Sequence, residues 1–302
     1  MISLLTRAGC FVAIIVLGAV LRKIGFFKEG DFALLGKISL RITLPAAIIS
    51  SFADKTIDLG LLTIILIGLG MGVLYMAVAY LVNLRSAKEQ QAFELLNLSG
   101  CNVGAFTIPF LQSFLGGGAV VVASIFDVGN AAIGLGTSYG IALSIKEGKG
   151  FSWKRIGKAL SRAVALMTYV VMVILTLLDI RLPGFVLQFA DVVGSANTFV
   201  AMLMIGVGFK LSANKSQIGK LVKLIALRYG IGAVLATAFW CLLPFDLLTR
   251  QTLVILAFSP IISAAPAFTG ELKGDVGLSS AFNSICIVLS LVIYVALLSV
   301  ML

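Results

Sequence analysis

The amino-acid sequence predicts an all-α membrane protein of about ten transmembrane helices in two inverted five-helix repeats, with broken crossover helices four and nine. The first observation is composition: hydrophobic residues make up 60% and charged residues 12% of the 302 residues, and mean hydropathy is +1.12. A water-soluble domain would carry about twice that charged fraction. The second observation is a series of long apolar runs, and the third is a pair of proline-containing runs at similar places in the two halves.

Charge clusters divide the chain into apolar runs of about 20 residues, the length an α-helix needs to cross about 30 Å of hydrocarbon. The first run is expected to be a retained span rather than a secretory signal, because Arg22 and Lys23 follow the apolar stretch and no small-residue cleavage site stands out. In chain order the expected spans are residues 3–21, 32–53, 59–83, 92–115, 119–145, 160–178, 185–211, 221–243, 252–270 and 276–302.

The formal net charge of +10 comes from basic residues in short loops, where such residues set orientation in the membrane. Nucleic acid is not an expected partner, because these residues form no patch on a folded domain. The loops alternate between crowded and sparse, which predicts an even number of spans in the cell (cytoplasmic) membrane with both termini outside. The sparse side has Arg7, Lys55, Arg181 and Arg250, and the expected cytoplasmic side has Arg22, Lys23, Lys28, Arg85, Lys88, Lys146, Lys149, Lys154, Arg155, Lys158, Lys210, Lys215, Lys220 and Lys223.

Cysteine and histidine usage narrows the chemistry. The four cysteines, Cys10, Cys101, Cys241 and Cys286, are single residues within expected spans and are interpreted as small packing residues, so no metal site is expected. The chain has no histidine, which removes imidazole ligands, a Ser/His/Asp triad and a histidine proton relay. We therefore expect no cofactor and no enzymatic activity.

A weak internal repeat divides the chain into residues 1–150 and 151–302, within one integral membrane domain. At a shift of about 155 residues, Arg7-Ala8 meets Arg162-Ala163, Leu35-Gly36 meets Val193-Gly194, and Pro109 falls near Pro260. Each half would hold five spans, and an odd number places the second copy in the membrane with the opposite orientation. The basic loop over residues 146–158 is the expected joint.

The fourth and ninth spans contain helix breakers. In AFELLNLSGCNVGAFTIPFLQSFLGGG, Pro109 lacks an amide proton and is expected to break or kink the helix, and LVILAFSPIISAAPAFTGELKG contains Pro260 and Pro266. If the breaks cross at membrane depth, their half-helix N-termini carry partial positive charge and favour an anion. The alternative is proline kinks that only shape packing. The expected substrate-binding residues are Asn102, Gly104, Thr107, Pro109, Asn130, Ser259, Pro260 and Ser263.

Charged residues within the spans are candidates for coupling. Asp127 shares a helix face with Asn130 and could carry a proton or orient Asn102, or it could make a structural hydrogen bond. Lys37 and Arg41 share a face of the second span; Lys37 can reach back to the surface, while Arg41 could attract an anionic substrate or serve the scaffold. The charged residues expected at wet helix ends are Glu94, Asp191 and Arg228.

The pattern Asn-x-Gly, with proline seven residues after the asparagine and FLQSFLG following, resembles the fourth helix of the auxin efflux carrier family, whose bacterial members include malate and malonate permeases. The segments KISLRITLPAAI, FDVGN, SANTFVAMLMIGVGFKL and SPIISAAPAFTGELKGD extend the resemblance over nearly the whole chain. Thr107 and Phe199 depart from it, where such carriers commonly have glycine and proline. The resemblance implies crossing helices four and nine, a scaffold of helices one, two, six and seven, and a moving unit of the other six.

Together these features predict a secondary transporter that moves a small organic anion by alternating access. The expected substrate is a carboxylate or dicarboxylate such as malate or malonate, or an auxin-like acid. No Walker-type nucleotide motif is present, so the expected energy source is a gradient, with a proton or sodium as the coupling ion. A sodium-coupled symporter, a channel and an intramembrane enzyme are the alternatives. The expected partners are the substrate and the lipid bilayer, and a homodimer is left open.

Overall fold

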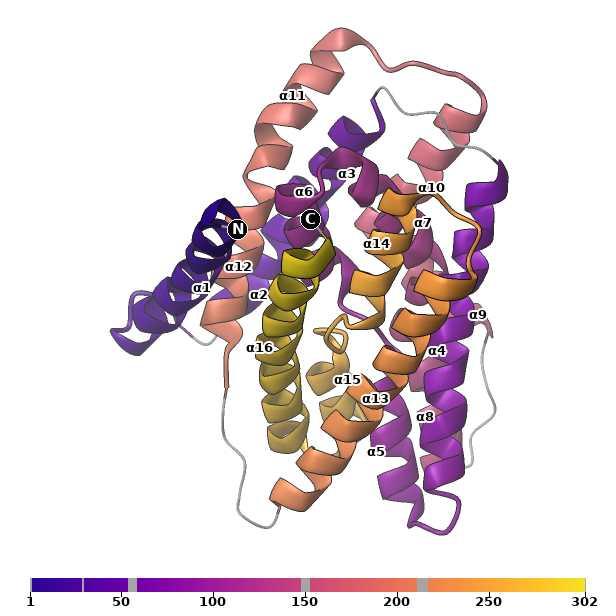
Figure 1. Cartoon of the computed structure of the whole chain (residues 1–302). Coiled ribbons are helices and arrows are strands. Elements are labelled where there is room, and N and C mark those ends of the chain that lie inside the picture. Colours follow the sequence, from indigo (N-terminus) through magenta and orange to yellow (C-terminus); the bar gives the residue numbers. More distant parts are fainter. Residues whose placement is uncertain (1, 29, 54–58, 148–152, 211–216, 302) are drawn as a thin grey trace.

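The computed structural model describes residues 2–28, 30–53, 59–147, 153–210 and 217–301. These residues form helices joined by short loops, and no strand occurs among them (Figure 1). The all-helical prediction is therefore confirmed. In chain order the elements are α1 (Ile2–Lys23), α2 (Asp31–Ile38), η1 (Ser39–Thr43), α3 (Leu44–Phe52), η2 (Leu59–Leu62), α4 (Thr63–Val82), α5 (Lys88–Ser99), η3 (Val103–Thr107), α6 (Ile108–Phe114), α7 (Gly117–Ala132), η4 (Ile133–Thr137), α8 (Ser138–Glu147), α9 (Trp153–Ser161), α10 (Val164–Leu177), α11 (Gly184–Ser195), α12 (Asn197–Gly208), α13 (Ile218–Leu242), α14 (Leu247–Ala257), α15 (Ala265–Glu271) and α16 (Val276–Met301).

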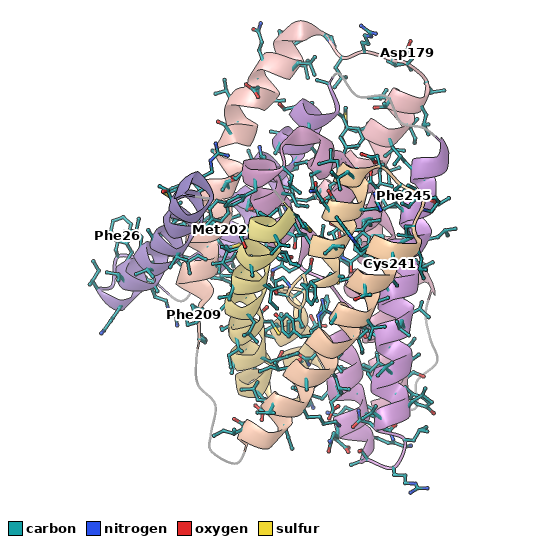
Figure 2. The ribbon with its side chains drawn as sticks, viewed as in Figure 1. Phe26, Asp179, Met202, Phe209, Cys241 and Phe245 are labelled. Atoms are coloured by element: carbon teal, nitrogen blue, oxygen red, sulfur yellow. The ribbon has the colours of Figure 1, made fainter. Side chains whose placement is uncertain are left out.

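Six helical segments among the described residues are long and apolar enough to cross a membrane, and each coincides with an expected span. Their apolar side chains cover the outside of the bundle as well as its core: Phe189 and Val292 are exposed, while Met202 is fully buried. Figure 2 shows Phe26 on the outside and Met202 within the bundle. The six spans are Asp31–Phe52, Gly60–Val82, Gly117–Lys146, Gly184–Gly208, Ile218–Leu242 and Val276–Met301.

Several expected spans differ in detail from the helices of the structure. The sixth, residues 160–178, is mostly α10, which begins at Val164; its first two residues belong to a separate helix, α9. The seventh, residues 185–211, is two helices that meet at Ala196, and its last residue lies outside the described part. The second contains a π-helical turn, η1, which ends two residues before Pro45, so the wider turn accommodates the proline's missing amide proton.

Glycines let two pairs of helices approach until their backbones touch. A Cβ atom added to Gly129 of α7 would lie 2.0 Å from a carbonyl of α4, and one added to Gly206 of α12 would lie 2.0 Å from a carbonyl of α1. Gly68 and Gly18 make the reciprocal approaches from α4 and α1. Such small-residue contacts are typical of helix association in membranes, where close packing replaces the hydrophobic effect.

The helices pack in two groups. In one, α1 and α2 pack on α12, and α3 packs on α10 and α11; in the other, α4 packs on α5 and α7, α5 on α8, and α13 on α14. The groups meet where α3 and α10 pack on α7 and where α6 packs on α12. Figure 1 shows α1 and α12 on one side of the molecule and α4, α5 and α8 on the other.

Two helical segments are interrupted inside the bundle. Between α5 and η3 the chain leaves the helix over residues 100–102, and between α14 and α15 it leaves the helix over residues 258–264. The second interruption contains Pro260, as expected. The first lies upstream of Pro109, which instead occupies the first turn of α6 after the π-helical turn η3. The break expected at Pro109 therefore lies upstream of it, and the departure from the α-helix next to this proline is the π-helical turn that precedes α6.

Candidate functional site

The two interruptions cross and complete each other's backbone hydrogen bonds. The Asn102 amide donates to the Pro260 carbonyl at 2.9 Å, and the Ile262 amide donates to the Gly100 carbonyl at 3.2 Å, which makes an antiparallel bridge between Cys101 and Ile261. A side chain at Gly100 would approach Ile262 within about 3 Å, so glycine allows the crossing. Four backbone groups that the interruptions remove from helices thereby find partners in each other.

Arg228 of α13 binds the carbonyl ends of both broken helices. Its guanidinium donates to the carbonyls of Leu98 and Ser259, each at 2.7 Å, and to that of Pro260 at 3.3 Å. Its carbon Cζ lies 4.4 Å from the ring centroid of Tyr75. A cation at the C-terminal ends of α5 and α14 matches the negative ends of both helix dipoles.

The position of Arg228 corrects an expectation. This side chain was expected at a wet helix end, but it is 1% exposed and lies at the crossing. Glu94 was likewise expected at such an end. It is buried, and it pairs with Lys223 at 2.8 Å and accepts a hydrogen bond from Asn83. The two residues are interior parts of the fold because α13 packs across α5 and α14.

On the opposite side of the crossing lies a cavity of about 280 Å³. The start of the half-helix Val103–Phe114 forms one wall, with Val103, Gly104 and Ala105 lining it. The first amides of a helix have no partner within that helix, so these residues direct partial positive charge to the cavity. The crossing therefore separates charge: the carbonyl ends of α5 and α14 contact Arg228, and the start of the half-helix Val103–Phe114 lines the cavity.

Asn102 and Ser263 stand where the two interrupted segments meet the cavity. The Asn102 side-chain amide donates to the Ser263 hydroxyl at 2.7 Å, which joins the two segments across the crossing. Asn102 is 4% exposed. Both residues were expected in the site, and both line the cavity together with Gly104.

Asp127 and Asn130 of α7 form a second polar wall. The Asn130 amide donates to Asp127 Oδ1 at 2.7 Å and to the Cys101 carbonyl at 3.0 Å, and its own oxygen accepts the Cys101 amide at 3.0 Å. Asp127 therefore orients Asn130, which holds the first interruption, rather than Asn102 directly. The buried Tyr169 hydroxyl lies beside the carboxylate but makes no hydrogen bond of normal geometry with a described residue.

Two exposed arginines are also among the residues that line the cavity. Arg41 comes from the π-helical turn η1, and Arg162 comes from the link between α9 and α10. Arg41 was an expected site residue, whereas Arg162 was not. The signal that could have found Arg162 was its alignment with Arg7 in the internal repeat, but Arg7 binds the Ser113 carbonyl instead. Lys37 does not line the cavity.

Four other expected residues lie outside the cavity. Thr107 and Ser259 face away from it and share hydrogen bonds with Tyr294, at 2.8–3.1 Å between the hydroxyl oxygens. The Pro109 carbonyl accepts a hydrogen bond from Thr198, and the Pro260 carbonyl accepts the Asn102 amide. Thr107, Ser259 and Pro260 therefore belong to the crossing itself, and Pro109 lies where α6 packs on α12, so none of the four lines the cavity.

The cavity offers donors and positive charge to an anion, with Asp127 as its single carboxylate. Comparison of the chain with known protein families and with curated protein sequences finds no match. The resemblance to the auxin efflux carriers therefore rests on the quoted segments alone.

Proposed function

We propose that the protein is a secondary transporter of a small organic anion, a carboxylate or dicarboxylate, in the cell membrane. The observation that carries the proposal is the cavity beside the crossing, which is lined by the start of the half-helix, by Asn102 and Ser263, and by the exposed residues Arg41 and Arg162. A helix N-terminus stabilises an anion by about 0.3–1 kcal/mol, and by up to about 2 kcal/mol when partly buried. Arginine is well matched to carboxylate geometry, since it donates two parallel hydrogen bonds.

The same arrangement supports alternating access between two units. The helices of the first packing group, including α3 and α10, contribute Arg41 and Arg162, and those of the second contribute Asn102 and Asp127. A substrate held between them would be carried when one unit slides past the other. Ten spans in two inverted repeats remain part of this proposal. The mutual backbone bridge between one interruption from each half supports it.

Asp127 is the proposed carrier of the coupling proton. Its carboxylate accepts from Asn130, which in turn holds the backbone of Cys101. Protonation would change that hydrogen bond and so alter the first interruption, which couples charge to the shape of the binding site. Sodium coupling is the alternative, with the ion bound by carbonyls of the interruptions.

A ligand screen tests the proposal. Purified protein is heated with a series of mono- and dicarboxylates, with and without sodium, because a ligand that binds only the folded state stabilises it by about 2.7 kcal/mol at one hundred times its Kd. We expect at least one carboxylate to raise Tm in the wild type and in Asn197→Ala, but not in Asn102→Ala. Asn197 is an equally buried asparagine away from the cavity, hydrogen-bonded to Thr43. A wild-type Tm unchanged by every anion would count against the proposal.

A further inference from the structure

A buried hydroxyl in the cavity beside the crossing has no partner. Tyr169 of α10 is 1% exposed and lines this cavity, yet its hydroxyl makes no hydrogen bond of normal geometry with a described residue. No other described residue in the lining of this cavity has a buried side-chain nitrogen or oxygen atom without a partner. Because leaving a buried polar group unpaired destabilises a protein, such a group indicates a partner that the chain itself does not supply.

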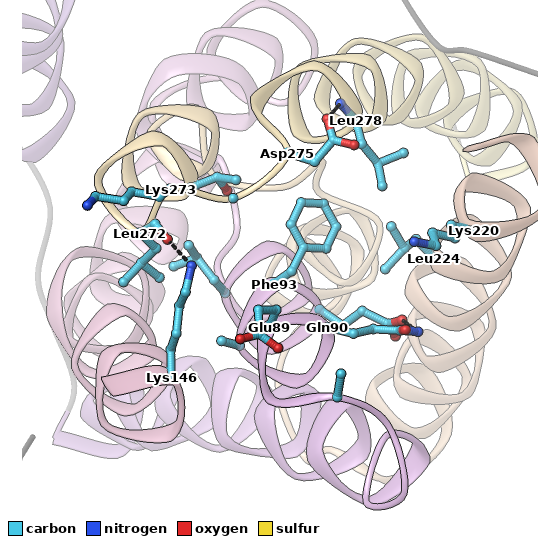
Figure 3. A pocket seen from close by; sticks show the side chains of 16 residues that line it. Glu89, Gln90, Phe93, Lys146, Lys220, Leu224, Leu272, Lys273, Asp275 and Leu278 are labelled. Atoms are coloured by element: carbon cyan, nitrogen blue, oxygen red, sulfur yellow. Dashed lines mark hydrogen bonds between the residues drawn. The ribbon is translucent and has the colours of Figure 1, made fainter. Parts of the chain in front are cut away.

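A larger cavity, at the end of the bundle where α5 and α13 begin, lacks this feature. It has a volume of about 410 Å³, and Lys146 in its wall donates to the Leu272 carbonyl (Figure 3). No described residue in its lining has a buried side-chain polar atom without a partner. Its charges balance, because the lining contains three acids, Glu89, Glu94 and Asp275, and three lysines, Lys146, Lys220 and Lys273.

The Tyr169 hydroxyl borders a space that a glycine leaves open. A Cβ atom added to Gly104 would lie 3.4 Å from Tyr169 Oη, 3.7 Å from Asp127 Oδ2 and 2.9 Å from Leu44 Cδ2. Gly104 belongs to the π-helical turn η3, at the start of the half-helix Val103–Phe114. A hydroxyl donor, the start of a helix and one carboxylate oxygen therefore meet around a single position in the cavity.

The helix α10 contributes more than this hydroxyl to the cavity. Val164, Ala165 and Leu166 of its first turn also line the space. The first amides of a helix have no partner within that helix, and they give its start a partial positive charge. The start of α10 and the Tyr169 hydroxyl therefore both favour an anion in the same cavity.

We infer that Tyr169 binds the substrate, with its hydroxyl donating a hydrogen bond to the anionic group in the space beside Gly104. The inference rests on the proposed function and adds a residue that the proline segments did not indicate. A hydroxyl suits this role, because hydrogen bonds to an ionised acceptor are roughly twice as strong as neutral ones. Asp127 borders the same space, and two carboxylates there repel each other unless one is neutral. Tyr169 thus places the substrate next to the proposed carrier of the coupling proton.

Replacing Tyr169 with phenylalanine tests the inference, because the change removes only the hydroxyl. Thermal unfolding of the purified full chain is measured alone and with malate, malonate, acetate or phenylacetate. Without a probe, the Tm of Tyr169→Phe should equal or exceed that of the wild type, since the hydroxyl has no partner to lose. Titration calorimetry with the probe that raises the wild-type Tm most should give Tyr169→Phe a Kd roughly 10–150-fold higher, the loss expected for one hydrogen bond to a charged group.

Tyr229→Phe is the matched control. The Tyr229 hydroxyl donates to the Cys286 carbonyl at 2.7 Å and does not line the cavity, so this variant should have a lower Tm and an unchanged Kd. Gly104→Ala is a second test of the site, because its methyl group would fill the space beside Tyr169 while the flexible end of Leu44 moves aside. It should weaken binding at least as much as Tyr169→Phe does.

The outcomes separate this inference from the proposed function. Equal Kd values for the wild type and Tyr169→Phe would overturn the inference and leave the proposed function standing, with the hydroxyl then holding a water molecule. Weaker binding accompanied by a fall in Tm as large as that of Tyr229→Phe would also overturn it, because the hydroxyl would then have a partner within the protein. A wild type that binds none of the four probes would overturn both.

Discussion

Replacing Arg228 with methionine removes the group that holds the carbonyl ends of both interrupted helices. Methionine keeps much of the apolar volume but donates no hydrogen bond. The carbonyls of Leu98 and Ser259 would then lose the only partner that the described residues give them, while the Pro260 carbonyl keeps the Asn102 amide. Each buried carbonyl left without a partner costs about 1–3 kcal/mol, so the expected destabilisation is about 2–6 kcal/mol.

The reference state adds to this effect. In separated helices within lipid, an arginine at the helix centre costs about 2.5–3.5 kcal/mol on insertion scales, and methionine removes that penalty from the unassembled state. Both contributions therefore lower the stability of the assembled protein. Arg250→Met is the matched control, because Arg250 also lies over an aromatic ring, Trp240, but donates only one long hydrogen bond, at 3.4 Å. Its expected cost is about 1 kcal/mol or less.

Reversible unfolding in mixed micelles of SDS and a mild detergent measures these differences. From most to least stable, the expected order is wild type, Arg250→Met, Arg228→Lys and Arg228→Met. Arg228→Lys lies above Arg228→Met because lysine keeps the positive charge, although it reaches fewer carbonyls than arginine does. An Arg228→Met protein as stable as Arg250→Met would refute the reasoning that Arg228 holds the crossing together.

Three further predictions concern other parts of the molecule. Gly129→Ala should destabilise the protein by about 1–3 kcal/mol, because its Cβ would meet α4, whereas Gly70→Ala, with nothing within 4 Å, should not; thermal unfolding compares the two variants. Asp127→Asn should flatten the pH dependence of substrate flux in proteoliposomes, and an unchanged profile would remove this residue as the proton carrier. Lys223→Met should lower the free energy of unfolding by about 1–3 kcal/mol, a range set below that of a fully buried ion pair because the Lys223 side chain is 34% exposed and water screens its charge. Adding Glu94→Gln should restore part of the lost free energy of unfolding, because the unpaired carboxylate is then gone.

The helices were largely predictable because apolar length depends on local sequence. The six spans follow from runs of about 20 apolar residues between charges. The place of the first interruption was not predictable in the same way. Pro109 follows a π-helical turn, which accommodates the proline. The backbone instead leaves the helix at Gly100, whose carbonyl accepts the Ile262 amide from the other half of the chain. That pairing is a tertiary contact, which local sequence does not reveal.

The candidate site was predictable in part for the same reason. Asn102, Gly104, Asn130 and Ser263 lie next to the interruptions, so their place in the chain indicated their place at the cavity. Thr107 and Ser259 lie equally close in sequence, but they face Tyr294. Thr107 ends a π-helical turn, which shifts the helical phase, and Ser259 lies outside any helix, so regular helical spacing gives the wrong face for both residues.

Arg228 and Arg162 show most clearly which site residues local sequence does not predict. Arg228 reaches the crossing from α13, far along the chain, and Arg162 reaches the cavity from the link after α9. No spacing rule connects either residue to the proline segments. The charge of Arg228 within an apolar run was the available signal, since a buried arginine requires partners for its donors.

The most direct test of the central claim is flux of a radiolabelled carboxylate, chosen by the ligand screen, into proteoliposomes. The account predicts saturable uptake by the wild type and by Asn197→Ala. Uptake by Asn102→Ala should fall roughly 10–150-fold, as loss of a hydrogen bond to a charged group of about 1.5–3 kcal/mol implies. Undiminished uptake by a folded Asn102→Ala protein, or no saturable uptake by the wild type, would contradict the assignment of the cavity beside the crossing as the substrate site.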